Sequence, residues 1–138
     1  MARREGNGVA GARVAAVLLL CALVQSAGMA ADWTAARLVT VIETDYSFEP
    51  ADLRFRAKTP YRLHLENRGA ERHDFTAPEF FQTVELRNPD ALEREQTSIG
   101  LQPGEQKDVY FVPRQSGRYT LRCADHDWAG MTGTIVVE

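Results

Sequence analysis

The sequence predicts an all-β protein, an antiparallel β-sandwich of Greek-key topology with one short helical or irregular insertion. Short runs rich in Val, Ile, Leu, Tyr and Phe recur along residues 31–138, and Gly, Pro and Asn separate them at regular spacing. In several runs apolar and polar residues alternate, which is the period of two that gives a strand one buried and one wet face. Short strands at such spacing are typical of a sandwich.

The predicted strands follow one another with short connections. The first is rich in Val and Ile and leads into a bend at residues 45–50, while the third alternates strictly. Turn chemistry at residues 67–69, 103–105 and 116–117 separates later strands. The strands are expected at residues 37–43, 53–58, 61–66, 73–76, 109–112, 118–123 and 132–137.

One stretch, residues 78–98, departs from this pattern. It has little alternation and is rich in Glu, Arg, Gln and Leu. Its apolar residues could form a helical stripe packed on the sandwich, interrupted at Asn88 and Pro89. We therefore expect an inserted helical or irregular segment whose stripe consists of Phe80, Phe81, Val84, Leu86 and Leu92.

Residues 1–30 are predicted to be a cleaved signal peptide. Three arginines precede an apolar run at residues 14–24 that is too short to span a bilayer. Gly28 and Ala30 provide the small residues expected before a cleavage site that follows Ala30. Cys21 is not expected to carry a lipid, because Leu20 stands where a small residue should precede it. We expect one domain, residues 31–138, exported to the periplasm without a membrane span.

The net charge of the whole chain is −3, and removal of the predicted leader takes away three Arg and one Glu. A mildly acidic domain without basic clusters gives no indication of nucleic-acid binding. Its charge is compatible with a basic protein partner. A monomer is the default expectation.

Three soft or borderline metal ligands lie close together near the C-terminus. Cys123, His126 and Met131 fall within nine residues, just before the last predicted strand. A thiolate, imidazoles and a weak thioether form the ligand set that selects copper in a trigonal site with a long axial Met. Such a site needs a second histidine from elsewhere in the chain. Cys123 is the only cysteine of residues 31–138, and metal binding would protect this thiol from oxidation.

Alternation separates the other two histidines. His64 shares a strand face with Arg62 and Glu66, so it is expected to point to solvent and is excluded as a ligand. His73 begins the strand that follows the turn at residues 67–69, and it is the expected fourth ligand. The same parity directs Cys123 toward the core, while His126 on the connecting loop should be the more exposed imidazole.

The chain resembles the cupredoxins, the blue copper proteins of the plastocyanin, pseudoazurin and azurin group. The Cys-x₂-His-x₄-Met spacing is similar to that of plastocyanin and pseudoazurin. By this resemblance, one type 1 copper ion would be held by His73, Cys123, His126 and Met131. The resemblance covers nearly all of residues 31–138 and is carried by segments 46–50, 65–67, 101–105, 117–123 and 130–137.

Three features differ from the usual family pattern. Asp74 follows the first His where many members have Asn; it could still hold the Cys loop but adds charge beside the metal. Asp125 and Asp127 flank His126, and their charge should favour the more positively charged metal and raise the basicity of that imidazole. Residues 78–98 resemble bacterial periplasmic cupredoxins more than plastocyanin.

The function expected from these residues is transfer of single electrons between unidentified redox protein partners. The electron would pass through the exposed edge of His126, with Trp128, Ala129 and Phe80 or Phe81 as an apolar docking patch. A copper carrier could share every ligand and is the main alternative. Copper enzymes need more histidines than the three present, so catalysis is not expected. A metal-free immunoglobulin-like module would leave the Cys, His and Met spacing unexplained.

Overall fold

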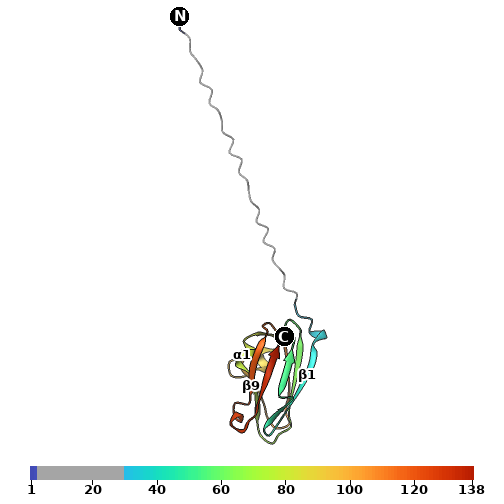
Figure 1. The fold of residues 1–138 in the computed structure, drawn as a ribbon. Coiled ribbons are helices and arrows are strands. Elements are labelled where there is room, and N and C mark those ends of the chain that lie inside the picture. The colour runs from blue at the N-terminus through green and yellow to red at the C-terminus, as the bar shows by residue number, and fades with distance from the viewer. Residues whose placement is uncertain (3–29) are drawn as a thin grey trace.

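The computed structural model describes residues 1–2 and 30–138 of the chain. In that part, two five-stranded sheets pack face to face around one hydrophobic core (Figure 1). The predicted β-sandwich is confirmed. The predicted signal peptide falls almost entirely on residues 3–29, which lie outside the described residues. No helix in the described part is long and apolar enough to cross a membrane.

Each sheet has its own set of strands. The order in the first sheet is β2-β1-β4-β8-β6. Its strands are β1 (Arg37–Thr44), β2 (Ser47–Glu49), β4 (Tyr61–Asn67), β6 (Val84–Leu86) and β8 (Gln106–Pro113). The order in the second sheet is β3-β10-β9-β5-β7. Its strands are β3 (Asp52–Phe55), β5 (His73–Thr76), β7 (Ser98–Leu101), β9 (Gly117–Arg122) and β10 (Thr132–Val137).

Both sheets are mixed, which corrects the expectation that the sandwich is antiparallel throughout. Strands β1 and β4 pair in parallel, and so do β3 and β10. Parallel neighbours require a crossover connection. The chain makes this crossover by placing β3 in the opposite sheet before β4 returns beside β1. Local alternation cannot reveal strand direction, because side chains alternate in the same way in both types of pair.

All seven predicted strands are present, and the buried faces follow the predicted parity in β4 and at the end of β9. In β4, Tyr61, Leu63 and Leu65 are buried while the residues between them are partly exposed. Strands β2, β6 and β7 were not predicted, and β2 lies where a bend was expected. Strands β2 and β6 have only three residues each, and the four-residue β7 begins where the expected insertion ends.

The insertion is mostly irregular, and its helical part is shorter than the predicted stripe. Helix α1 (Pro78–Phe81) forms one turn, and a 3₁₀ turn spans Pro89–Ala91. Phe80, Phe81 and Leu92 are buried. Val84 and Leu86 instead belong to strand β6, so the single helical stripe is wrong. Pairing with β8 satisfies the backbone of this segment, as a helix would have done.

The two ends of the sandwich differ in chemistry. At the end where β10 finishes, Phe55, Tyr61, Phe80 and Phe111 form a cluster with ring centroids 4.8–5.9 Å apart. The loop between β9 and β10 lies at the opposite end from the C-terminus (Figure 1). Three histidine and cysteine side chains meet there.

Candidate metal centre

Cys123 follows strand β9 directly and continues its inward-facing parity. Leu121 and Cys123 are both buried, as predicted from alternation. The Cys123 amide donates to the Met131 carbonyl (3.0 Å), which ties the two ends of the loop together. Burial raises the pKa of the Cys123 thiol, and the Asp74 amide, which donates to Sγ at 3.4 Å, lowers it. A bound cation would favour the thiolate at this position.

His73 begins β5, and its side chain is fully buried beside the Cys123 loop. Its position is fixed by the pairing of β5 with β7, in which His73 lies opposite Leu101. Its Nδ1 atom lies 3.1 Å from Nδ1 of His126. The structure therefore brings together two histidines that are 53 residues apart in the sequence.

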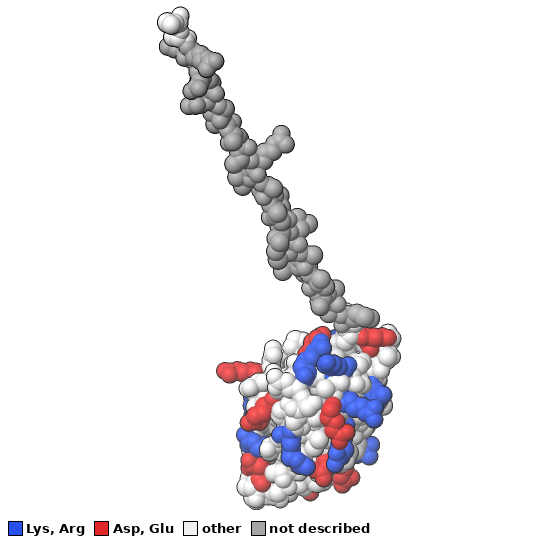
Figure 2. Space-filling model, turned by 45° about the horizontal axis from the view of Figure 1, so that its top comes forward, with Lys and Arg blue, Asp and Glu red and all other residues white. Residues whose placement is uncertain are grey.

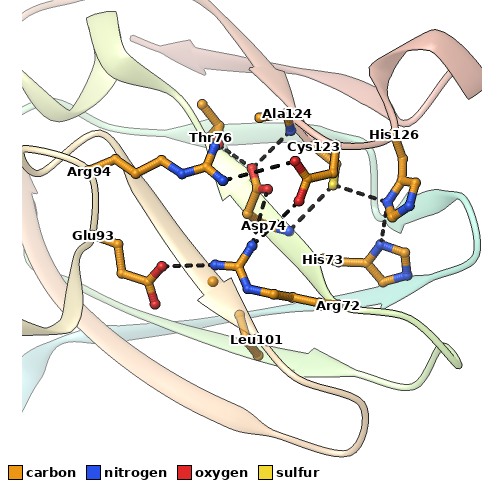
Figure 3. Close-up of polar contacts among 12 residues, drawn as sticks. Arg72, His73, Asp74, Thr76, Glu93, Arg94, Leu101, Cys123, Ala124 and His126 are labelled. Atoms are coloured by element: carbon orange, nitrogen blue, oxygen red, sulfur yellow. Dashed lines mark hydrogen bonds and ion pairs between the residues drawn. The ribbon is translucent and has the colours of Figure 1, made fainter.

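His126 lies on the loop, one turn after Cys123. Its amide donates to the Cys123 carbonyl (3.2 Å), and its Nδ1 is 3.5 Å from Cys123 Sγ. Donor atoms of His73, Cys123 and His126 all lie within 4.8 Å of one another (Figure 3). His126 is 8% exposed and His73 is fully buried, so the prediction that His126 is the more exposed imidazole is confirmed.

Met131 closes the loop just before β10. It is fully buried, its carbonyl accepts from Cys123, and its amide donates to the His126 carbonyl (3.3 Å). Gly130 adopts the left-handed conformation (φ 88°) at the turn that precedes it. The main chain thus places Met131 beside both loop ligands. Its role as the axial ligand remains a prediction.

His64 lies apart from this cluster, on the outer side of β4. Its two ring nitrogens bond Asp108 (2.8 Å) and Glu66 (3.2 Å). Its side chain is partly exposed, as its parity predicted. In the described part of the chain, the His73, Cys123 and His126 cluster is the one group of three or more such residues that could hold a metal ion.

Asp74 holds the cysteine loop through both its backbone and its side chain (Figure 3). Its amide donates to Cys123 Sγ, while Oδ1 accepts from the Ala124 amide (2.9 Å) and from the Thr76 hydroxyl. The expectation that Asp74 can replace the usual Asn in holding the loop is confirmed. Arg72 lies 3.8 Å from Oδ2 and provides a countercharge for this buried carboxylate.

The acidic residues that flank His126 in the sequence do not contact its ring. Asp125 pairs with Arg72 (3.6 Å), and Asp127 pairs with Arg122 (3.1 Å). The carboxylate on His126 is instead Glu71, whose Oε2 lies 2.8 Å from Nε2. Asp45 makes the corresponding contact with His73. Sequence reasoning missed both, because neither residue belongs to a spacing motif.

The surface around His126 has one large exposed aromatic residue. Trp128, in the 3₁₀ turn Asp127–Ala129, is 78% exposed, and its indole N–H donates to the Asp125 carbonyl. Phe80 and Phe81 are buried in the core, so the prediction that one of them contributes to a docking patch is wrong. Tyr46 takes that place, with its ring centroid 4.7 Å from His126 and 6.2 Å from Trp128.

The donor set fits copper. A buried cysteine sulfur and two buried imidazole nitrogens that face one another are the ligands of a trigonal copper–thiolate site. Both outer imidazole nitrogens already contact carboxylates, which leaves the inner nitrogens as donors. Copper would therefore be held by His73, Cys123 and His126.

A family model described as a cupredoxin-like domain matches residues 13–137. The chain belongs to the cupredoxin-like domain family. No curated protein sequence matches it significantly.

Solved structures with the same fold belong to proteins of several kinds. Auracyanin B is 24% identical, with a TM-score of 0.58 over 78% of this chain and 92% of that chain. The metal-binding domain of a Cu(I)-exporting P-type ATPase of Streptococcus pneumoniae is 12% identical, with a TM-score of 0.50 over 75% of this chain and 87% of that chain. A multicopper oxidase from Pseudomonas thermotolerans is 17% identical, with a TM-score of 0.58 over 79% of this chain and 30% of that chain. Identities this low show a shared fold only, so the site must support the function.

Proposed function

We propose that this chain is an exported blue copper protein that carries single electrons between redox protein partners. The observation that supports it most directly is the buried His73, Cys123 and His126 cluster, with Met131 joined to it through the main chain. Copper would supply a one-electron couple, since thiolate and thioether suit Cu(I) and imidazole suits both oxidation states. We assign Met131 as the fourth, weak ligand.

The residues around the cluster limit its rearrangement. Strand β5 fixes His73, and Asp74 holds both the sulfur and the Ala124 amide. The loop ends are closed by the bond between Cys123 and Met131. Ligands that are held by directional hydrogen bonds move little when the charge at the site changes. Such rigidity suits electron transfer.

The electron would enter and leave through the His126 side. Its imidazole is the more exposed of the two, and Tyr46 and Trp128 extend an aromatic surface from it. Acidic and basic side chains are interspersed over the face of the molecule shown in Figure 2. We assign partner contact to this aromatic surface, because Tyr46 and Trp128 are the exposed aromatic side chains beside His126.

Copper carriage to another exported protein is the alternative function. A carrier must release its metal, whereas Cys123 and His73 are fully buried and hydrogen-bonded to Asp74 and Asp45, and His126 is ion-paired with Glu71. This burial favours retention of the metal and hence electron transfer. The two functions differ in one measurable property, the rate at which a chelator removes copper.

A Cu(II) titration followed by visible absorption tests the proposal. We expect an intense blue band at one equivalent of copper that is bleached by a reductant and restored by an oxidant. Cys123→Ser should abolish the band. The matched control is His64→Gln, which removes a histidine outside the cluster and should leave the band unchanged. A colourless protein, or copper lost to a chelator within seconds, would support carriage instead.

A further inference from the structure

Both histidines of the cluster contact a carboxylate at the ring nitrogen that points away from the cluster. His73 Nε2 lies 2.6 Å from Asp45 Oδ1, and His126 Nε2 lies 2.8 Å from Glu71 Oε2. The His73 contact is a short hydrogen bond, and the His126 contact is an ion pair at similar distance. The two carboxylates come from different loops, one after β1 and one before β5.

Asp45 is held in place by its surroundings. Its second oxygen accepts from the Ala70 amide at 2.8 Å. That hydrogen bond and the His73 imidazole lower the pKa of Asp45. Gly69 packs against the pair so closely that an added Cβ would clash with Asp45 Oδ1 and lie 2.8 Å from His73 Nε2. The contact between Asp45 and His73 therefore occupies a fitted space that a side chain at position 69 would fill.

Glu71 is held at both of its oxygens. The Tyr46 hydroxyl donates to Oε1 (3.2 Å), which leaves Oε2 for His126. The main chain of Glu71 is fixed as well, because buried Asn67 donates its side-chain amide to the Glu71 carbonyl (2.7 Å). Tyr46 thus contacts Glu71 through its hydroxyl and the His126 ring through its own ring.

These bonds determine which imidazole nitrogen carries the proton. The Asp45 carboxylate accepts, so a neutral His73 ring donates from Nε2–H, and the Glu71 carboxylate beside His126 Nε2 favours the same tautomer there. Both Nδ1 atoms then carry lone pairs, and they face one another at 3.1 Å beside the Cys123 sulfur. Two lone pairs at this separation have no proton to share. They form an arrangement that a cation would stabilise.

We propose that Asp45 and Glu71 are positioning residues that fix both histidines as Nε2–H tautomers and bias the bound copper toward Cu(II). The inference rests on the proposed copper site and specifies which residues tune it. A negatively charged carboxylate beside the outer ring nitrogen raises the basicity of the imidazole and favours the more highly charged metal ion.

Neighbouring acidic residues do not share this role. Asp125 and Asp127 each lie within 4 Å of an arginine. Among the ion pairs of residues 30–138, Asp45 and Glu71 pair only with the two histidines. Their charges therefore act on the ligands without a nearby cation to offset them.

Paired substitutions separate charge from hydrogen bonding. Asp45→Asn and Glu71→Gln keep an accepting oxygen and remove the charge, whereas Asp45→Leu and Glu71→Leu remove both. Gly69→Ala displaces Asp45 without altering either partner. Asp127→Asn is the control, since it removes a nearby charge that does not touch a ligand.

The first readout is the histidine tautomer in the metal-free protein, measured by nitrogen-15 NMR. Wild type, Asp45→Asn and Glu71→Gln should show Nε2–H for His73 and His126. Each Leu variant should lose this preference at its own histidine only, and Gly69→Ala should lose it at His73. Wild-type histidines protonated at Nδ1 would overturn the assignment whether or not copper binds.

The second readout is the ratio of Cu(II) to Cu(I) affinity, obtained from the reduction potential of the copper-loaded protein. Second-shell changes alter metal affinity by about 10- to 100-fold. We expect each charge-removing variant to lower this affinity ratio about tenfold. For a one-electron couple, that change raises the reduction potential by about 59 mV. The Asp127→Asn potential should stay near wild type. Equal potentials in all variants would overturn the charge bias, while an intact blue band would still support the proposed function.

Discussion

The two ends of the sandwich are stabilised by different physical interactions. The end near the C-terminus is a cluster of aromatic rings, including Phe55, Phe80 and Phe111, whose burial is non-directional. The opposite end, called the ligand end because it contains the His73, Cys123 and His126 cluster, instead buries polar residues. His73, Asp74 and Asn67 are buried there, and each needs specific hydrogen-bond partners. The comparison shows how one fold combines a general source of stability with a site of fixed geometry.

The ligand end also contains a carboxyl group without such partners. Glu43, near the end of β1, is fully buried, and neither carboxyl oxygen has a hydrogen-bond partner among the described residues. Burial, followed by the Asp74 carboxylate, raises its pKa to about 8, while Arg72 opposes the shift. Loss of the Glu43 proton therefore makes the ligand end lower the stability of the fold at high pH. The aromatic end is insensitive to pH. Substitutions at the two ends should separate stability from function.

The largest effect on folding is expected at the aromatic end. Phe80→Ala removes a fully buried ring that contacts Phe55 and Phe111, and should lower the free energy of unfolding by about 3–5 kcal/mol. The absorption spectrum of the copper-loaded protein should not change, because Phe80 lies away from the ligands. Denaturant unfolding and visible spectra of one preparation measure both. A changed copper band would contradict the separation of the two ends.

A smaller, pH-dependent effect is expected for Glu43→Gln. Because the pKa of Glu43 is raised from 4.5 in the unfolded chain to about 8, the folded state retains a proton that the unfolded state has lost. The free energy of unfolding should therefore fall as pH rises from about 5 to 8. Glu43→Gln should remove this fall, a difference on the order of 3 kcal/mol at pH 8. Denaturation curves of both proteins at pH 5 and 8 measure it, and parallel pH profiles would contradict the pKa shift.

The smallest effect on stability is expected at the exposed surface of the ligand end. Trp128→Ala should change the free energy of unfolding by less than about 0.5 kcal/mol, because the side chain is mostly exposed. It should nevertheless slow electron exchange with a redox protein partner, measured by stopped-flow, and leave the copper band intact. Leu38→Ala is the control, since Leu38 is also exposed but lies on β1. Equal rates in the two variants would show that Trp128 does not take part in docking.

The elements with strong local patterns were predictable. Alternation in residues 61–66 placed Leu63 and Leu65 inside and His64 outside, and the same parity directed Cys123 inward. Strand β7 was missed because it has only four residues and begins inside the segment interpreted as an insertion. Phe80 is buried, as the predicted apolar stripe required, but its assignment to the docking patch was wrong because local sequence does not tell a core aromatic residue from a surface one.

The sequence by itself determined the sandwich class, the buried faces of its strands and the spacing of Cys123, His126 and Met131 on one loop. These properties depend on local periodicity and on short distances along the chain. Only the tertiary structure decided the parallel pairings, the approach of His73 to that loop, and the contacts of Asp45 and Glu71 with the two imidazoles. Such contacts join distant segments, and their partners are chosen by how the two sheets pack rather than by any local pattern.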